Sequence, residues 1–140
     1  MERPDARKRY TQMVLKQSFL TLLKEKPVNK ITVKEVCALA QLNRATFYAH
    51  YSDCFALMEC IENELLAAFE KSLRYVNSFD VTALIEAIYD MVEQNREACR
   101  VLILGNAGST ILMKMIAVAK ENSLAYWRQE LPLSLIHISE

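Results

Sequence analysis

Polar and basic side chains occur in a dense group between residues 43 and 50 of this 140-residue chain. The group combines amide and hydroxyl donors, one guanidinium, one phenol ring and one imidazole. Side chains of these types donate hydrogen bonds to phosphate oxygens and to base edges in the major groove of DNA. Its members are Asn43, Arg44, Thr46, Tyr48 and His50. The chemistry that these residues favour is therefore nucleic-acid binding.

Two short helices joined by a turn are expected to hold this group. Thr32 and Glu35 have the spacing of a capping box, in which each side chain accepts a hydrogen bond from the backbone amide of the other residue. Ile31 and Val36 bracket the box as a hydrophobic staple. Further apolar side chains recur at helical spacing and can hold the second helix across the first; they are Val33, Cys37, Ala40, Leu42 and Phe47. The pattern predicts a helix-turn-helix, which binds DNA through its second helix.

Residues 32–54, together with the helices expected before and after them, resemble the TetR/AcrR family of transcriptional regulators. The resemblance covers roughly the first half of the chain. It implies that the second helix of the motif lies in the major groove of a double-stranded operator, and that a homodimer reads a palindrome. It also implies that a small molecule bound in the C-terminal domain changes the spacing of the two DNA-reading heads.

The resemblance assigns roles to individual residues. Lys34 and Arg44 fall where the family contacts base edges or phosphates, and a guanidinium there can donate two hydrogen bonds to guanine. Asn43 lies beside them on the expected reading surface. The positions implied to grip the DNA backbone are Thr32, Thr46, Tyr48 and His50, and Ala45 falls where a small side chain permits close approach.

Two residues depart from the family pattern. Gln41 stands in the turn where the family usually has glycine, so a residue with a side chain is expected to adopt a backbone conformation that glycine tolerates better. Cys54, after Ser52 and Asp53, replaces a lysine that usually binds phosphate. One DNA-backbone contact is therefore expected to be missing, and a lysine restored at this position is expected to tighten DNA binding.

The charge distribution supports a DNA-binding N-terminal part. Residues 1–55 carry 10 basic and 5 acidic side chains, whereas residues 56–140 carry 7 and 12, so balances of +5 and −5 cancel in the neutral total. The positive field is thus concentrated around the motif. A basic N-terminal arm, formed by Arg3, Arg7, Lys8 and Arg9, is expected to attract phosphates or to enter a minor groove. A solvated, frayed terminus is the alternative.

An all-α fold is predicted, because the chain has only two glycines and three prolines, is 52% hydrophobic and lacks alternating β-rich runs. Helices are expected from about Asp5 to Glu25 and after Ser52 or Asp53, the latter carrying Met58, Ile61, Leu65 and Phe69 at helical spacing. A polar turn over residues 77–80, with Asp80 as a cap, precedes a helix over 81–94 and a break near Asn95. Two further helices are predicted over 96–104 and 109–129, separated by the glycine pair of 105–108.

Three segments are predicted. Residues 1–53 form the helix-turn-helix domain, and residues 54–132 form part of a helical effector-binding domain. Residues 133–140 resemble a translated sequencing-library adapter and are predicted to be non-native, with a docking tail or a naturally short regulator as alternatives. The family's dimer uses two long C-terminal helices that the pattern does not predict here. The chain is therefore expected to be a poor dimer that exposes apolar surface on its last helix.

Flexible thioethers and aromatic rings in the second half could line a pocket for a small apolar effector. The candidates are Tyr89, Met91, Leu102, Met113, Met115, Ile116 and Trp127. Ordinary core packing is the alternative for each of them, since helical spacing does not separate a cavity wall from a packed face. The pattern selects no ligand class.

The sequence favours neither an enzyme nor a metal or cofactor site. Four cysteines lie too far apart for a zinc or redox motif and are expected to be buried, with a thiol sensor at Cys54 or Cys60 as the alternative. No signal peptide or membrane span is predicted, and a cytoplasmic location is expected. A co-activator or protein-binding module that keeps the fold but reads DNA weakly is the alternative to a DNA-binding regulator, favoured by Cys54 and the neighbouring Asp53.

Overall fold

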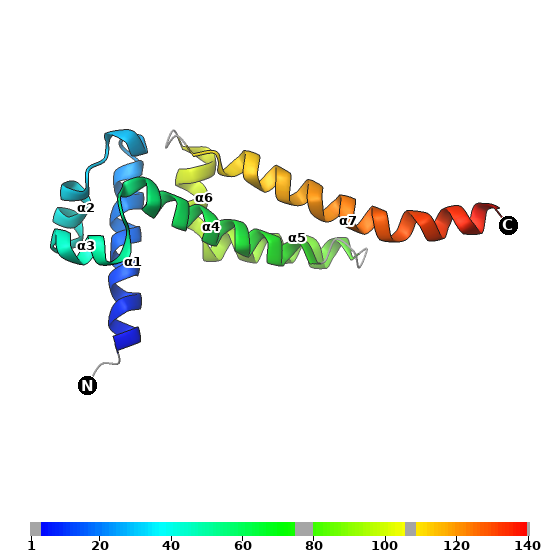
Figure 1. Ribbon diagram of the computed structural model, residues 1–140, viewed down its shortest axis with the longest axis horizontal. Coiled ribbons are helices and arrows are strands. Elements are labelled where there is room, and N and C mark those ends of the chain that lie inside the picture. Colours follow the sequence, from blue (N-terminus) through cyan, green and yellow to red (C-terminus); the bar gives the residue numbers. More distant parts are fainter. Residues whose placement is uncertain (1–3, 75–79, 106–108, 140) are drawn as a thin grey trace. The chain divides into compact units, whose positions relative to one another are not determined.

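The computed structural model describes residues 4–74, 80–105 and 109–139. Helices and turns make up these ranges, which contain no β-strand, and the prediction of an all-α fold is confirmed (Figure 1). The helices are α1 (Pro4–Leu23), α2 (Val33–Ala40), α3 (Arg44–His50), α4 (Cys54–Ser72), α5 (Val81–Gln94), α6 (Arg96–Cys99) and α7 (Ile111–Ser139), with a 3₁₀ turn at Val28–Lys30 and a π turn at Arg100–Leu104.

Two compact units divide the chain. The first comprises Met1–Glu64 and Glu97–Ser109, and the second comprises Leu65–Arg96 and Thr110–Glu140. Helix α4 supplies residues to both units, since the division falls between Glu64 and Leu65. The predicted domain boundary between residues 53 and 54 stays a prediction.

A small apolar core holds the first unit together. Helix α1 packs on α2, and α2 packs on α3, as the blue-to-cyan part of Figure 1 shows. Leu15, Phe19, Val36, Phe47 and Leu57 are completely buried there. Burial of each such side chain contributes about 1.5 to 3 kcal/mol. The predicted core positions of the motif are thereby confirmed for Val36 and Phe47.

Most predicted helix boundaries agree with the structure to within two residues. Helix α4 starts after Asp53, whose Oδ1 accepts a hydrogen bond from the Ala56 amide at 2.8 Å. Asp80 caps α5 in the same way, accepting from the Ala83 amide at 3.0 Å. The rest of the predicted polar turn, residues 77–79, and the predicted break at 106–108 lie outside the described residues.

Two predictions about the ends of the chain are wrong. The basic arm does not precede the first helix, because Arg7, Lys8 and Arg9 lie within α1; Arg3 lies outside the described residues. The last helix does not end near residue 129 but continues to Ser139. The assignment of residues 133–140 to a non-native tail stays a prediction.

Candidate nucleic-acid interface

The start of α2 is fixed by the capping box that the sequence predicts. The Glu35 amide donates to Thr32 Oγ1 and the Thr32 amide donates to Glu35 Oε1, both at 3.2 Å. The Lys26 ammonium also pairs with the Glu35 carboxylate, and this contact holds the pKa of Glu35 below its ordinary value. The stabilising contribution of this carboxylate is therefore present at neutral pH and is lost as the pH falls through that lowered pKa.

Gln41 forms the turn between α2 and α3 in a left-handed conformation, with φ 58° and ψ 42°. The Leu42 amide donates to the Cys37 carbonyl at 3.0 Å, and the Gln41 amide donates to the Ala38 carbonyl at 3.4 Å. These two bonds form a Schellman motif, which ordinarily has glycine at the left-handed position. The expectation that a residue with a side chain adopts this conformation is confirmed.

Replacing Gln41 by glycine is expected to stabilise the first unit. The left-handed conformation costs a residue with a side chain about 1 to 2 kcal/mol, whereas the added freedom of glycine in the unfolded chain costs about 0.4 to 1 kcal/mol. Gln41→Gly should raise the free energy of unfolding in urea by about 0.5 to 1 kcal/mol. Gln41→Ala keeps the strain and is the matched control. A glycine variant no more stable than the alanine variant would contradict this reasoning.

Asn43 caps α3 and is bonded within the motif. Its Oδ1 accepts hydrogen bonds from the amide and from the hydroxyl of Thr46, both at 2.8 Å. The Nδ2 group of Asn43 is left as the donor that can face a ligand. Asn43 and Thr46, both predicted to contact DNA, therefore also fix the start of α3, the helix that carries most of the other predicted DNA-binding residues. The sequence interpretation missed this capping role, although the three-residue spacing could have revealed it.

Helix α3 has one buried side and one open side. Phe47 is completely buried, whereas Tyr48 is 55% exposed, and the two rings meet edge to face with centroids 5.5 Å apart. Arg44 and Ala45 are exposed in the first turn, and His50 is half-buried in the last. Phe47 marks the buried side of the helix. The exposed side chains of Arg44, Ala45 and Tyr48 therefore lie on its open side.

Tyr51 anchors the end of α3, which the sequence interpretation did not anticipate. Its amide donates to the Phe47 carbonyl at 2.9 Å, and its ring lies 5.9 Å from that of Phe47. The ring is buried, and within the described part of the chain its hydroxyl has no hydrogen-bond partner. Burial raises the pKa of this phenol well above its ordinary value.

All eight predicted DNA-binding residues lie in the first unit, on α2, on α3 or at their caps. Lys34 is exposed in the first turn of α2, next to the exposed cap residue Thr32. Thr46 is half-buried because its hydroxyl bonds to Asn43. The basic side chains Arg7, Lys8 and Arg9 are exposed on α1. A polar and basic surface of this kind suits phosphates and base edges.

Cys54 does not lie where the resemblance implies a DNA contact. It is 5% exposed, and burial raises the pKa of its thiol to about 11. Burial also raises the pKa values of Cys37 and Cys99, so these thiols stay protonated at neutral pH and behave as small apolar side chains. Cys60 is half-buried and donates to Glu64 Oε1 at 3.8 Å. Cys54 is thus poorly suited to the alternative role of a thiol sensor.

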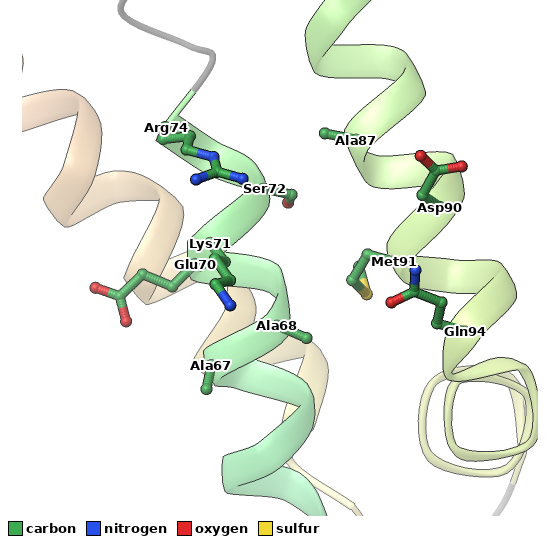
Figure 2. A pocket seen from close by; sticks show the side chains of 10 residues that line it. All are labelled: Ala67, Ala68, Glu70, Lys71, Ser72, Arg74, Ala87, Asp90, Met91 and Gln94. Atoms are coloured by element: carbon green, nitrogen blue, oxygen red, sulfur yellow. The ribbon is translucent and has the colours of Figure 1, made fainter.

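A groove of about 760 Å³ lies in the second unit between α4 and α5 (Figure 2). Small and apolar side chains, Ala67, Ala68, Ala87 and Met91, line it together with the polar residues Glu70, Lys71, Ser72, Arg74, Asp90 and Gln94. In Figure 2 the Met91 side chain points across the groove from α5 toward α4. The groove therefore offers a ligand both apolar contacts and charged groups.

The predicted effector residues differ in burial. Met91 lines the groove, and Leu102 is buried in the first unit. Met115 is buried on α7. Four candidates are largely exposed, namely Tyr89, Met113, Ile116 and Trp127. The role of these residues in binding an effector stays a prediction, because helical spacing identifies faces but not what covers them.

The described residues provide neither a cluster of metal ligands nor a membrane-spanning helix. They contain no group of three or more His, Cys, Asp or Glu side chains that could hold a metal ion. None of their helices is both long enough and apolar enough to cross a membrane.

The chain is 30% identical over 59 residues to a protein described as an uncharacterized HTH-type transcriptional regulator, YxbF, from Bacillus subtilis (strain 168). The match covers 42% of this chain and 16% of the relative, so the chain spans a small part of that protein's length. No family model matches the chain. The helix-turn-helix type named in that description agrees with the geometry of α2 and α3.

Proposed function

We propose that this chain is a TetR-like, ligand-responsive regulator that reads the major groove of double-stranded DNA with α3 and acts as a repressor. The observation that carries the proposal is the two-sided character of α3, in which Phe47 is buried while Arg44 and Tyr48 face outward. A major groove admits an α-helix, and guanidinium, phenol and amide groups can read or grip DNA there. Repressors of this kind act on the chromosome, which implies a cytoplasmic location.

The groove between α4 and α5 is the proposed effector site. The alanines and Met91 that line it suit an apolar body, and the charged lining residues Lys71, Arg74 and Asp90 can orient a polar group. A bound molecule would contact α4 directly, and α4 also supplies residues to the DNA-binding unit. If α4 has two positions that differ in DNA affinity, a ligand that binds one of them more tightly shifts the chain toward that position and thereby changes its affinity for DNA.

A salt titration tests DNA binding and separates it from the alternative of a protein-binding module. Fluorescence anisotropy with a random duplex, and with a palindrome selected from a random pool, should give affinities that fall steeply with salt. The expected slope of log K against log salt is about −0.9 for each phosphate contacted. The selected palindrome should bind more tightly than the random duplex. Absent or salt-independent binding to both would favour the co-activator or protein-binding module.

Arg7→Ala and Lys8→Ala should weaken binding to every sequence alike. Both side chains are exposed on α1, and neither belongs to the helix-turn-helix. If they contact phosphates, each loss should flatten the salt slope by about one unit and leave the preference among operators unchanged. Glu25→Ala, an exposed acidic position just after α1, is the control that removes a charge of opposite sign. A change in operator preference would instead indicate that the cations read bases.

A further inference from the structure

Helix α7 is apolar on two opposite sides. Ile111 and Met115 are buried on one side. The other side carries large apolar residues that are between 43% and 70% exposed, which we call the α7 outer face: Leu112, Met113, Ile116, Leu124 and Trp127. A surface helix normally has a polar side opposite its buried one, and a helix that is apolar all round is normally covered. The α7 outer face therefore has the character of an interface.

Helix α5 has a second exposed apolar stripe. Val81, Ile85, Tyr89 and Val92 follow one another at helical spacing and are between 38% and 65% exposed; we call them the α5 outer face. The buried side of the same helix is marked by Met91. The α5 outer face extends about 17 Å from Val81 to Val92. The α7 outer face extends about 23 Å from Leu112 to Trp127, so it is long enough to cover the whole α5 outer face.

The charges beside the two faces have opposite signs. Lys120 lies one turn from Ile116 and from Leu124, within the α7 outer face, and Arg128 follows Trp127; both cations are exposed. The α5 outer face is bordered by two exposed acids, Glu86 three residues before Tyr89 and Glu93 four residues after it. Glu93 also pairs with Arg96.

This arrangement distinguishes between the ways in which two copies could meet. Antiparallel pairing of two α7 outer faces would bring Lys120, near the middle of the face, close to its own counterpart. Pairing of two α5 outer faces would bring together the acids Glu86 and Glu93. Docking of α7 on α5 instead places cations opposite acids along two apolar stripes. Like charges across an interface are unfavourable, whereas complementary charges fix its register.

We infer that the α7 outer face of one chain docks on the α5 outer face of a second copy of this chain. Under a two-fold axis each chain contributes one face of each kind, so the contact occurs twice. This surface differs from the four-helix bundle that the TetR/AcrR resemblance implies. It is also independent of whether the chain binds DNA.

Charge reversal tests the inference. Sedimentation velocity from low micromolar to several hundred micromolar protein should show association beyond the 16.1 kDa single chain. Lys120→Glu or Glu86→Lys alone should weaken association by about tenfold, since each replaces an attraction by a repulsion. The double variant, with both changes in one chain, should recover most of the loss. Trp127→Ser should weaken association at least tenfold through the lost apolar contact, about as expected for an aromatic anchor.

Glu59→Lys, an exposed charge reversal on the part of α4 that belongs to the first unit, is the matched control and should leave association unchanged. Circular dichroism checks that every variant keeps its helix content, which is expected because all the substituted side chains are exposed. A single chain at every concentration would overturn the inference and agree with the expectation of a poor dimer. Association that the double variant fails to restore would also overturn it, because pairing of like faces would then fit better.

Discussion

Cys54→Lys should lower the free energy of unfolding by about 1 to 3 kcal/mol, the usual cost of forcing a larger side chain into a packed site. The thiol is 5% exposed at the start of α4, and its raised pKa reflects that burial. A lysine there must either push its stem through the surrounding side chains or bury its charge. Urea denaturation of the wild-type and variant chains measures the loss.

The same variant separates two interpretations of this position. The family resemblance implies that a lysine here gains a phosphate contact, whereas the burial of Cys54 implies damage to the core. Ser52→Lys is the matched control, because Ser52 is exposed two residues earlier and can present a cation without entering the core. A Cys54→Lys chain that is as stable as the wild type and binds DNA with a steeper salt slope would refute the structural argument.

Arg44→Ala should cost about 1 to 3 kcal/mol on the preferred operator and relax selectivity at one base pair in each half-site. The side chain is exposed in the first turn of α3, where a guanidinium can donate two hydrogen bonds to guanine. Competition binding against operators with single substitutions measures the loss at each base pair. Equal losses on the operator and on random DNA would mean that Arg44 contacts phosphate only.

Arg44→Lys refines that measurement. Lysine keeps the positive charge but lacks the planar fork that pairs with two acceptors at once. Binding to random DNA should therefore be preserved in this variant, while discrimination at the contacted base pair falls. If discrimination survives the change, a different residue of the interface, such as Lys34, carries it.

Features that depend on neighbouring residues could be predicted from the sequence. The Thr32 and Glu35 box, the Asp80 cap and the bounds of α5 all involve residues three or four positions apart, so local spacing is enough to identify them. The left-handed conformation of Gln41 could be predicted in the same way, because Gln41 directly follows the short capped helix α2, where a left-handed residue commonly ends a helix.

Features that depend on tertiary contacts could not be predicted in this way. Lys26 reaches Glu35 across the 3₁₀ turn, and nothing in the pattern marks that pair. Whether Cys54 faces DNA or the core depends on the rotation of α4 about its own axis. The burial of the candidate effector residues could not be predicted for the same reason, since Leu102 and Trp127 both fit apolar helical stripes while one is buried and the other exposed.

The cap at the start of α3 restricts how this protein could be retargeted to a new operator. Asn43 accepts two hydrogen bonds from Thr46, so replacing either residue to alter base preference would also disturb the helix that presents the other contacts. Arg44, Ala45 and Tyr48 take no part in this cap, although the Tyr48 ring contacts Phe47, and they lie on the open part of the helix. A combinatorial library that varies these three positions and keeps Asn43 and Thr46 should therefore yield more folded clones with altered operator preference than one that varies all five.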